Sequence, residues 1–233
     1  MKDNNRLIIN ILKLIGTFTL FYYSEVFKLI PIKLFGLDKN NLSVRTSYLL
    51  TVFAYICLAL IIILLYRKEL VDEWKKFRND IGKNIDTSFK YYFIGLGGMV
   101  LFNVIINFIL KLGQSQNEHA VQQMIKSAPV LMLICAGVLA PITEELTFRK
   151  AFKNVFSKKW VFVIVSGLVF GLLHVIGFEL KTPLELLYIL PYGCLGGCFA
   201  YMDYEIDSTY PSILMHMMHN TVLTLLSILT AIL

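Results

Sequence analysis

Long apolar segments alternate with short polar ones along the whole 233-residue chain. A helix needs about 20 apolar residues to cross a bilayer core of about 30 Å, and most of these segments approach that length. The clearest is Thr46–Tyr66, which contains the uninterrupted apolar run Leu58–Leu65. The pattern predicts an all-α bundle of about seven transmembrane spans, within a range of six to eight: Leu7–Tyr23, Thr46–Tyr66, Phe89–Leu112, Pro129–Phe156, Trp160–Phe178, Leu184–Tyr201 and Pro211–Leu233.

Polar intervals separate the predicted spans. The first span can continue through Val26–Phe35, with Pro31 as the expected bend. We expect polar loops at Gly36–Arg45 and Gly113–Lys126, and an acidic connector at Met202–Tyr210.

The segment Arg67–Ser88 has a different pattern. Its apolar residues Leu70, Trp74, Phe77 and Ile81 recur at helical spacing, and charged residues occupy the other positions. This predicts an amphipathic helix that lies on the cytoplasmic surface of the membrane, with a protein-binding helix as the alternative.

Composition supports a membrane protein. Hydrophobic residues make up 57% of the chain and charged residues only 16%, with a mean hydropathy of +0.66. A soluble domain of this length cannot bury so much apolar surface. The net charge of +6 lies mostly in short basic clusters beside apolar segments, which favours contact with anionic lipid over nucleic-acid binding.

The basic clusters predict the orientation of the bundle. Arg67–Lys90 and Arg149–Lys159 are the densest, and a seven-span count puts them on one side. The positive-inside rule places both clusters in the cytoplasm, together with the N-terminus, and the C-terminus outside. The four cysteines all lie in apolar segments, so we expect free thiols.

Charged residues end the apolar run that begins at Pro129. Glu144, Glu145 and Arg149 are costly at or near hydrocarbon, and such residues usually mark function. Glu145 and Arg149 are four apart and share a helix face, so they can form an ion pair. Glu144 is rotated from Glu145 by about 100°, which leaves its carboxylate free for chemistry.

Two further predicted spans carry polar groups, namely His174 in one and His216, His219 and Asn220 in the other. Glu144 and His174 each lie about 20 Å from the turn between their helices, so we expect them at the same level. His216 lies only about 8 Å into its helix. All these groups reach one level if the hairpin formed by the predicted helices Pro129–Phe156 and Trp160–Phe178 protrudes into the cytoplasm. This arrangement predicts a water-filled cavity that opens on the cytoplasmic side.

These residue types suit the hydrolysis of a peptide bond. A carboxylate beside a histidine, here Glu144 and His174, can activate water. A histidine and an amide, here His216 and Asn220, can donate hydrogen bonds to an oxyanion. Alternatively, Glu144, His174 and His216 could bind a catalytic zinc ion, although no His-Glu-x-x-His motif supports a metal. His219 could join such a site or serve as a packing residue.

The sequence resembles the CAAX protease and bacteriocin-processing (CPBP, or Abi) family of intramembrane proteases. The resemblance rests on three motifs in order between Pro129 and Leu223: Glu-Glu-x-x-x-Arg (Glu144, Glu145, Arg149), Phe-x-x-x-His (Phe170, His174) and His-x-x-x-Asn (His216, Asn220). One departure is Lys150, where relatives often have glycine. This puts a close approach between helices there in doubt.

The resemblance implies a multi-helix endopeptidase in which Glu144 and His174 activate water, and His216 and Asn220 form the oxyanion site. Glu145, Arg149 and Phe170 would support them. The family is commonly described as metalloproteases, but a glutamate-dependent mechanism that requires no cofactor has also been argued, and we favour it over zinc. We expect a single membrane domain, residues 1–233, with N-terminal spans in 1–126 and the catalytic core in 127–233.

The expected partners are the lipid bilayer and a peptide or membrane-protein substrate. Because the Lys-, Asn- and Ile-rich composition indicates a low-GC bacterium, prenylated substrates are not expected. Two other classes stay open: a non-enzymatic bacteriocin-immunity protein of the cell membrane, and a transporter with the Glu and His residues as a proton relay.

Overall fold

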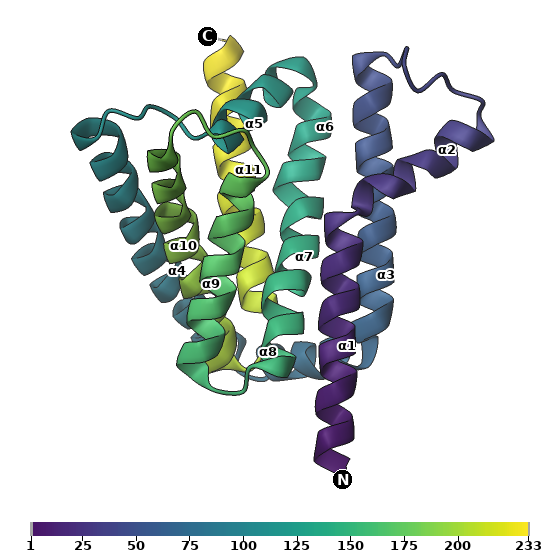
Figure 1. Ribbon diagram of the computed structural model, residues 1–233. Coiled ribbons are helices and arrows are strands. Elements are labelled where there is room, and N and C mark those ends of the chain that lie inside the picture. Colours follow the sequence, from purple (N-terminus) through teal and green to yellow (C-terminus); the bar gives the residue numbers. More distant parts are fainter. Residues whose placement is uncertain (1, 233) are drawn as a thin grey trace.

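The computed structural model describes residues 2–232, and every regular element in this part of the chain is helical (Figure 1). Within these residues, six helices are long and apolar enough to cross a membrane, or seven if a bent pair at the N-terminus counts as one span. The predicted all-α membrane bundle is therefore confirmed. The elements are α1 (Lys2–Tyr22), η1 (Ser24–Lys28), α2 (Leu29–Leu34), α3 (Val44–Asn79), α4 (Ile81–Val104), η2 (Ile105–Ile109), α5 (Gln116–Ser127), α6 (Pro129–Ile134), η3 (Cys135–Leu139), α7 (Ala140–Glu145), η4 (Leu146–Lys150), α8 (Ala151–Val155), α9 (Lys159–Ile176), η5 (Pro183–Tyr188), α10 (Ile189–Ile206) and α11 (Tyr210–Ile232).

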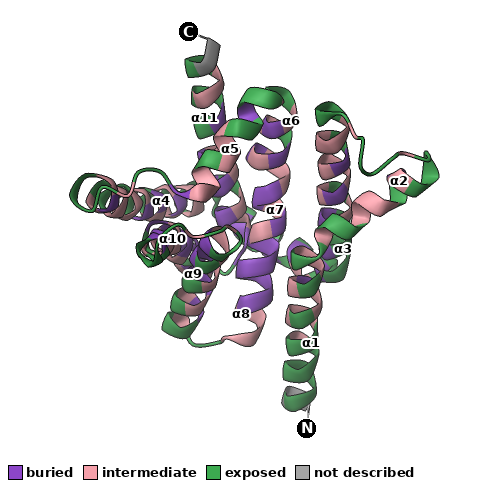
Figure 2. Cartoon of the chain, turned by 45° about the horizontal axis from the view of Figure 1, so that its top comes forward, coloured by how far each residue is buried: buried purple, intermediate pink, exposed green. Residues whose placement is uncertain are grey.

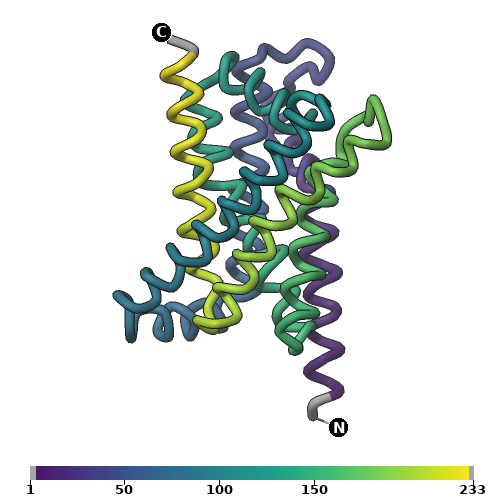
Figure 3. The backbone as a smooth tube through the Cα atoms, turned by 90° about the vertical axis from the view of Figure 1, so that its left-hand side faces the viewer, coloured from purple at the N-terminus to yellow at the C-terminus, as the bar shows by residue number. Residues whose placement is uncertain are grey.

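The two ends of the chain lie at opposite ends of the bundle (Figures 1 and 3). The α3–α4 junction and the α8–α9 turn lie at the N-terminal end, so the two basic clusters share that end, as the predicted topology requires. The C-terminal end carries α5, the start of α3 and the α9–α10 connection. The predicted end of the last helix, Leu233, lies outside the described residues.

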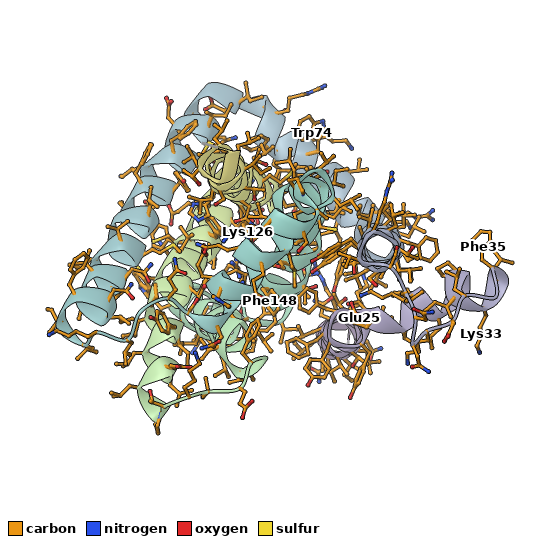
Figure 4. The ribbon with its side chains drawn as sticks, turned by 90° about the horizontal axis from the view of Figure 1, so that it is seen from above. Glu25, Lys33, Phe35, Trp74, Lys126 and Phe148 are labelled. Atoms are coloured by element: carbon orange, nitrogen blue, oxygen red, sulfur yellow. The ribbon has the colours of Figure 1, made fainter. Side chains whose placement is uncertain are left out.

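The N-terminal span bends at a different place from the one predicted. The segments Asn4–Tyr22 and Ser24–Leu34 meet at 58°, so the chain turns at Tyr23. Pro31 lies inside α2, in the first turn of that short helix, where a missing N–H costs little. Beyond the bend, α2 projects sideways from the bundle, with Lys33 and Phe35 near its tip (Figure 4).

The predicted surface helix Arg67–Ser88 is not a separate element. Its first part continues α3 to Asn79, and its second part begins α4. Leu70 and Phe77 are buried in the protein, whereas Trp74 is 40% exposed. Ile81 is 45% exposed, so half of the expected apolar stripe packs against the bundle. In Figure 4 the end of α3, marked by Trp74, runs sideways toward α4.

The predicted polar loop Gly113–Lys126 is mostly helical. Ser115 caps α5, because its side-chain oxygen accepts a hydrogen bond from the Glu118 backbone N–H at 3.1 Å. Ser115 and Glu118 have the spacing of a capping box, a helix-start signal that was missed. The acidic connector is likewise shorter than predicted, because α10 continues to Ile206.

The Pro129–Val155 segment is continuous and helical, and it contains two π-helical turns, η3 and η4, on either side of Glu144 and Glu145. Figure 2 shows that its second half is the most continuously buried stretch of the fold. π-helical turns inside α-helices occur often at functional sites because they re-aim side chains and free backbone carbonyls.

Helices α9 and α10 pack closely, as the small residues of the sixth span predicted. A Cβ atom at Gly171 would lie 2.6 Å from the Ile189 carbonyl oxygen. Only glycine permits this backbone approach, which fixes α9 and its His174 against α10.

Candidate active site

Glu145 is fully buried and has two partners. Its Oε2 atom lies 2.9 Å from Arg149 Nε, so the predicted ion pair is present. Its Oε1 atom lies 2.8 Å from Nδ1 of His216, a contact that the sequence analysis did not foresee. A carboxylate oxygen can only accept, so Nδ1 is the protonated donor when Glu145 is ionised. Glu145 thereby sets the orientation of the His216 ring.

Arg149 is fully buried as well. Its guanidinium lies 4.6 Å from the centre of the Phe170 ring, and Nη1 donates to the Ser166 hydroxyl at 3.2 Å. The Phe170 ring also contacts the rings of His174 at 4.3 Å and His216 at 5.9 Å, measured between centroids. Phe170 therefore packs between the ion pair and both histidines.

Glu144 lies on the other side of His216. Its Oε2 atom is 3.8 Å from His216 Nε2 and has no protein hydrogen-bond partner. Adjacent carboxylates thus approach the two ring nitrogens of one histidine, Glu145 at Nδ1 and Glu144 at Nε2. Glu144 also lines a cavity, so its side chain borders the space that a substrate would enter.

His174 is held by its own helix. Its Nδ1 lies 2.8 Å from the Phe170 carbonyl oxygen, which can only accept, so Nδ1 carries the proton. In the neutral ring, Nε2 therefore has a free lone pair. The ring stacks on Tyr192, with 4.7 Å between centroids and 24° between planes.

Asn220 faces the first π-helical turn. In η3 the Ala140 N–H bonds to the Cys135 carbonyl, five residues back, and the next position is Pro141, which has no N–H. The Ala136 carbonyl is therefore left without a helical donor. Asn220 Nδ2 donates to it at 2.9 Å, and this leaves the second amide N–H free.

All four predicted catalytic side chains, Glu144, His174, His216 and Asn220, line one cavity of about 540 Å³. The other residues that line this cavity were not predicted from the sequence. Tyr55 of α3, from the half of the chain without motifs, also lines it, and no sequence signal singles this residue out. His219 lines it too and lies 3.2 Å from the Tyr92 hydroxyl through Nδ1.

The cavity extends toward the C-terminal end of the bundle. Its outer lining comes from η1, the start of α3, α5 and the later part of α11, where side chains such as Glu25, Met124 and Leu223 are exposed. The sequence predicts an opening on the same side as the N-terminus. That expectation is wrong, because these elements lie at the opposite end from the N-terminus (Figure 1).

Among residues 2–232, no three His, Cys, Asp or Glu side chains converge closely enough to hold a metal ion. His216 Nδ1 contacts Glu145 and His174 Nδ1 contacts a carbonyl, so each ring has only Nε2 left. All four cysteines are free, as predicted.

Lys150 forms ion pairs with α3. It is buried, and its Nζ lies 2.6 Å from Glu73 Oε1 and 3.2 Å from Glu69 Oε2, both on α3. Glu73 Oε2 in turn accepts the backbone N–H of Thr209, just before α11. The lysine therefore joins the Glu144 helix, α3 and the start of the His216 helix.

Residues 126–222, which contain every predicted site residue, match the family model described as "Type II CAAX prenyl endopeptidase Rce1-like". The chain is 25% identical over 198 residues to the Bacillus subtilis (strain 168) protein named "Putative membrane peptidase YdiL", a match that covers 82% of this chain and 75% of that protein. An uncharacterized protein of Mycoplasma capricolum subsp. capricolum is 32% identical over 110 residues, which cover 44% of this chain and 31% of that protein. No solved structure matches.

Proposed function

Because residues 126–222 belong to the CPBP family of membrane proteases, we propose that this protein is an intramembrane endopeptidase that cleaves a peptide or a membrane protein. The observation that carries the proposal is the convergence of Glu144, His174, His216 and Asn220 on one cavity, with a Glu144 oxygen left unpaired. No serine, threonine or cysteine is needed as a nucleophile, because a carboxylate can activate water directly.

In the proposed reaction, Glu144 takes a proton from a water molecule that the His174 Nε2 lone pair helps to orient. The oxygen of this water attacks the substrate carbonyl carbon and generates a tetrahedral oxyanion. Glu144 then transfers the proton to the leaving nitrogen as the C–N bond breaks, which yields a carboxylic acid and an amine. The protons gained and lost by Glu144 balance over the cycle.

The oxyanion requires N–H donors. Asn220 supplies one of them. Its side-chain amide has two N–H bonds, and only one of these donates to the Ala136 carbonyl. His216 supplies a second when Nε2 is protonated in addition to Nδ1.

The direct test is cleavage by purified full-length protein in detergent, with a pool of internally quenched apolar peptides as the probe. We expect Glu144→Gln and His174→Gln to abolish cleavage, while Glu25→Gln, a change at the exposed rim of the same cavity, retains it. A proteomic comparison of cells that carry wild-type or Glu144→Ala protein would then identify the substrate. Full biological activity in both Glu144→Ala and His174→Ala cells would favour a non-enzymatic immunity factor or a transporter.

A zinc mechanism remains a competing proposal, and it makes a separate prediction. Elemental analysis of active protein would find about one zinc ion per chain, and thorough chelation would stop cleavage. Under the glutamate mechanism, chelated and metal-free protein stays active.

We also propose that the basic end of the bundle faces the cytoplasm and that the cavity opens on the outer side of the cell membrane. A single cysteine introduced at Lys39, in the loop before α3, tests this in a background without the four native cysteines. A membrane-impermeant thiol reagent should label it in intact cells. Labelling only after the cells are broken would contradict the orientation.

A further inference from the structure

Tyr192 connects the candidate active site to α5. Its ring stacks on His174, and its hydroxyl lies 2.9 Å from Ser115 Oγ and accepts a hydrogen bond from Asn117 Nδ2 at 3.2 Å. Ser115 is the N-cap of α5, and Asn117 lies in the first turn of that helix. One side chain on α10 thus contacts a predicted catalytic ring and the start of another helix.

Helix α5 is a distinct unit at the C-terminal end of the bundle (Figure 1). Before it, Lys111 and Gly113 have φ values of +54° and +82°, so the chain turns sharply after α4. After it, Ala128 is not helical (φ −153°, ψ +68°), and Pro129 starts a new helix. Because neither neighbouring helix continues into α5, its position depends on side-chain contacts such as those of Tyr192.

Helix α5 also forms part of the cavity wall. Asn117, Glu118, Val121 and Met124 line the cavity on its outer side. A substrate that reaches Glu144 from this end passes these side chains, and one wider than the entrance would displace them. Such a displacement would break the hydrogen bonds at the Tyr192 hydroxyl.

His174 has few other restraints. Its Nδ1 is bonded to the Phe170 carbonyl, and its ring contacts Phe170 on the same helix, four residues earlier. Tyr192 is the stacking partner that comes from a different helix. The orientation of the ring relative to the rest of the cavity therefore depends on Tyr192.

We infer that Tyr192 is a positioning residue, which holds the His174 ring in place and couples that ring to the docking of α5. The inference deepens the proposed function and rests on it only for the catalytic consequence. When α5 is docked, the Tyr192 hydroxyl is fixed by Ser115 and Asn117, and the stack on His174 is rigid. When α5 moves, the stack loosens.

The structural part is tested without any substrate. Full-length protein in detergent carries isotope-labelled histidine, and His174→Gln identifies the NMR signal of His174 among the four histidines. Tyr192→Leu removes the ring, so the His174 signal should shift. Tyr192→Phe keeps the ring but frees it from α5, so the signal should broaden or split. Ser115→Ala, which loosens the same hydroxyl from the α5 side, should resemble Tyr192→Phe.

Tyr188→Phe is the matched control. Tyr188 lies one turn before Tyr192, and its hydroxyl bonds to Asn107 and to the Gly113 carbonyl. Among the hydrogen bonds and ring pairs of residues 2–232, none joins Tyr188 to His174. It should leave the His174 signal unchanged. An unshifted signal in Tyr192→Leu would overturn the inference, and so would an equal effect of Tyr188→Phe and Tyr192→Phe.

The catalytic part of the inference is then tested by measuring the cleavage of the quenched peptide pool. We expect kcat to fall about 10- to 100-fold in Tyr192→Leu, by less in Tyr192→Phe, and KM to change little, because a misplaced catalytic group mainly costs rate. A shifted His174 signal with undiminished cleavage would reject the catalytic consequence. If even the wild type cleaves nothing, the proposed function fails, and the NMR result alone decides the positioning role.

Discussion

Glu145 and His216 are 71 residues apart in the chain, yet they share a contact of 2.8 Å in the buried centre of the bundle. The same carboxylate also pairs with Arg149, so one side chain neutralises a buried cation and orients a ring. Glu144 is left on the opposite side of that ring, facing the cavity. Two neighbouring glutamates therefore have separable roles.

The first prediction separates these roles. Glu145→Gln leaves the Arg149 guanidinium buried without a counter-charge, so we expect it to lower the free energy of unfolding by about 3–5 kcal/mol. Glu144→Gln breaks no ion pair with a permanent cation, and its effect should stay under about 1 kcal/mol. Both should lose at least about 100-fold in cleavage rate. Thermal unfolding in detergent, beside the peptide assay, checks the pair. Equal destabilisation by both variants would contradict this assignment.

The second prediction concerns Asn220, which has a structural and a proposed catalytic task. Asn220→Ala leaves the buried Ala136 carbonyl unpaired, which should cost about 1–3 kcal/mol of stability. Pro141→Ala adds an N–H that can bond to this carbonyl. The double variant should therefore regain much of the lost stability.

The double variant Asn220→Ala/Pro141→Ala should not regain cleavage activity together with stability, because the oxyanion donor is still missing. We expect kcat in the stabilised double variant to stay about 10²–10³-fold below that of wild type. Pro141→Ala alone should remain active and serves as the control. Recovered cleavage in the double variant would show that Asn220 acts only as a structural residue.

The third prediction concerns the buried pair of Lys150 and Glu73. Lys150→Met leaves the Glu73 carboxylate buried without its cation, which should lower the free energy of unfolding by about 3–5 kcal/mol. Adding Glu73→Gln removes this unpaired buried carboxylate, so the double variant should be more stable than Lys150→Met alone. Lys75→Met removes an exposed partner of Asp72 from the same part of α3 and should cost no more than about 1 kcal/mol. Additive losses in the double variant would exclude the pairing.

The fourth prediction concerns pH and Asp207, which lies in the connector between α10 and α11. Burial raises the pKa of its carboxyl, but hydrogen bonds from Lys153 and Lys76 outweigh burial and leave the pKa below the ordinary value of 3.8. The folded state thus favours the ionised form. Its stabilising contribution is complete above the unfolded-state pKa and is lost as the pH falls through the lower, folded-state pKa.

Asp207→Asn should therefore be less stable than wild type by a constant amount near neutral pH, and the gap should close below about pH 4. Unfolding curves of both proteins, recorded across that range at low salt, check the sign. Lys153→Met provides a control, because it removes one of the two cations that lower the pKa. A gap that widens in acid would contradict the prediction.

Local patterns in the sequence were enough for much of the architecture. Length and hydropathy identify the spans, because a bilayer demands about 20 apolar helical residues per crossing. Helical periodicity alone pairs Glu145 with Arg149, which are four residues apart on one face. Motif spacing selects Glu144, His174, His216 and Asn220, and the fold gathers them around one cavity. Their catalytic roles remain predictions.

Other features depend on contacts between residues far apart in the chain, and only the tertiary structure decided them. The sequence left Glu145 with one partner, because the approach of α11 that adds His216 is not encoded in local spacing. The side on which the cavity opens, the Lys150–Glu73 pair and the Tyr192 link to α5 follow from how the helices pack. Hydropathy determines which segments enter the membrane, whereas the close approach of particular side chains determines what those segments form together.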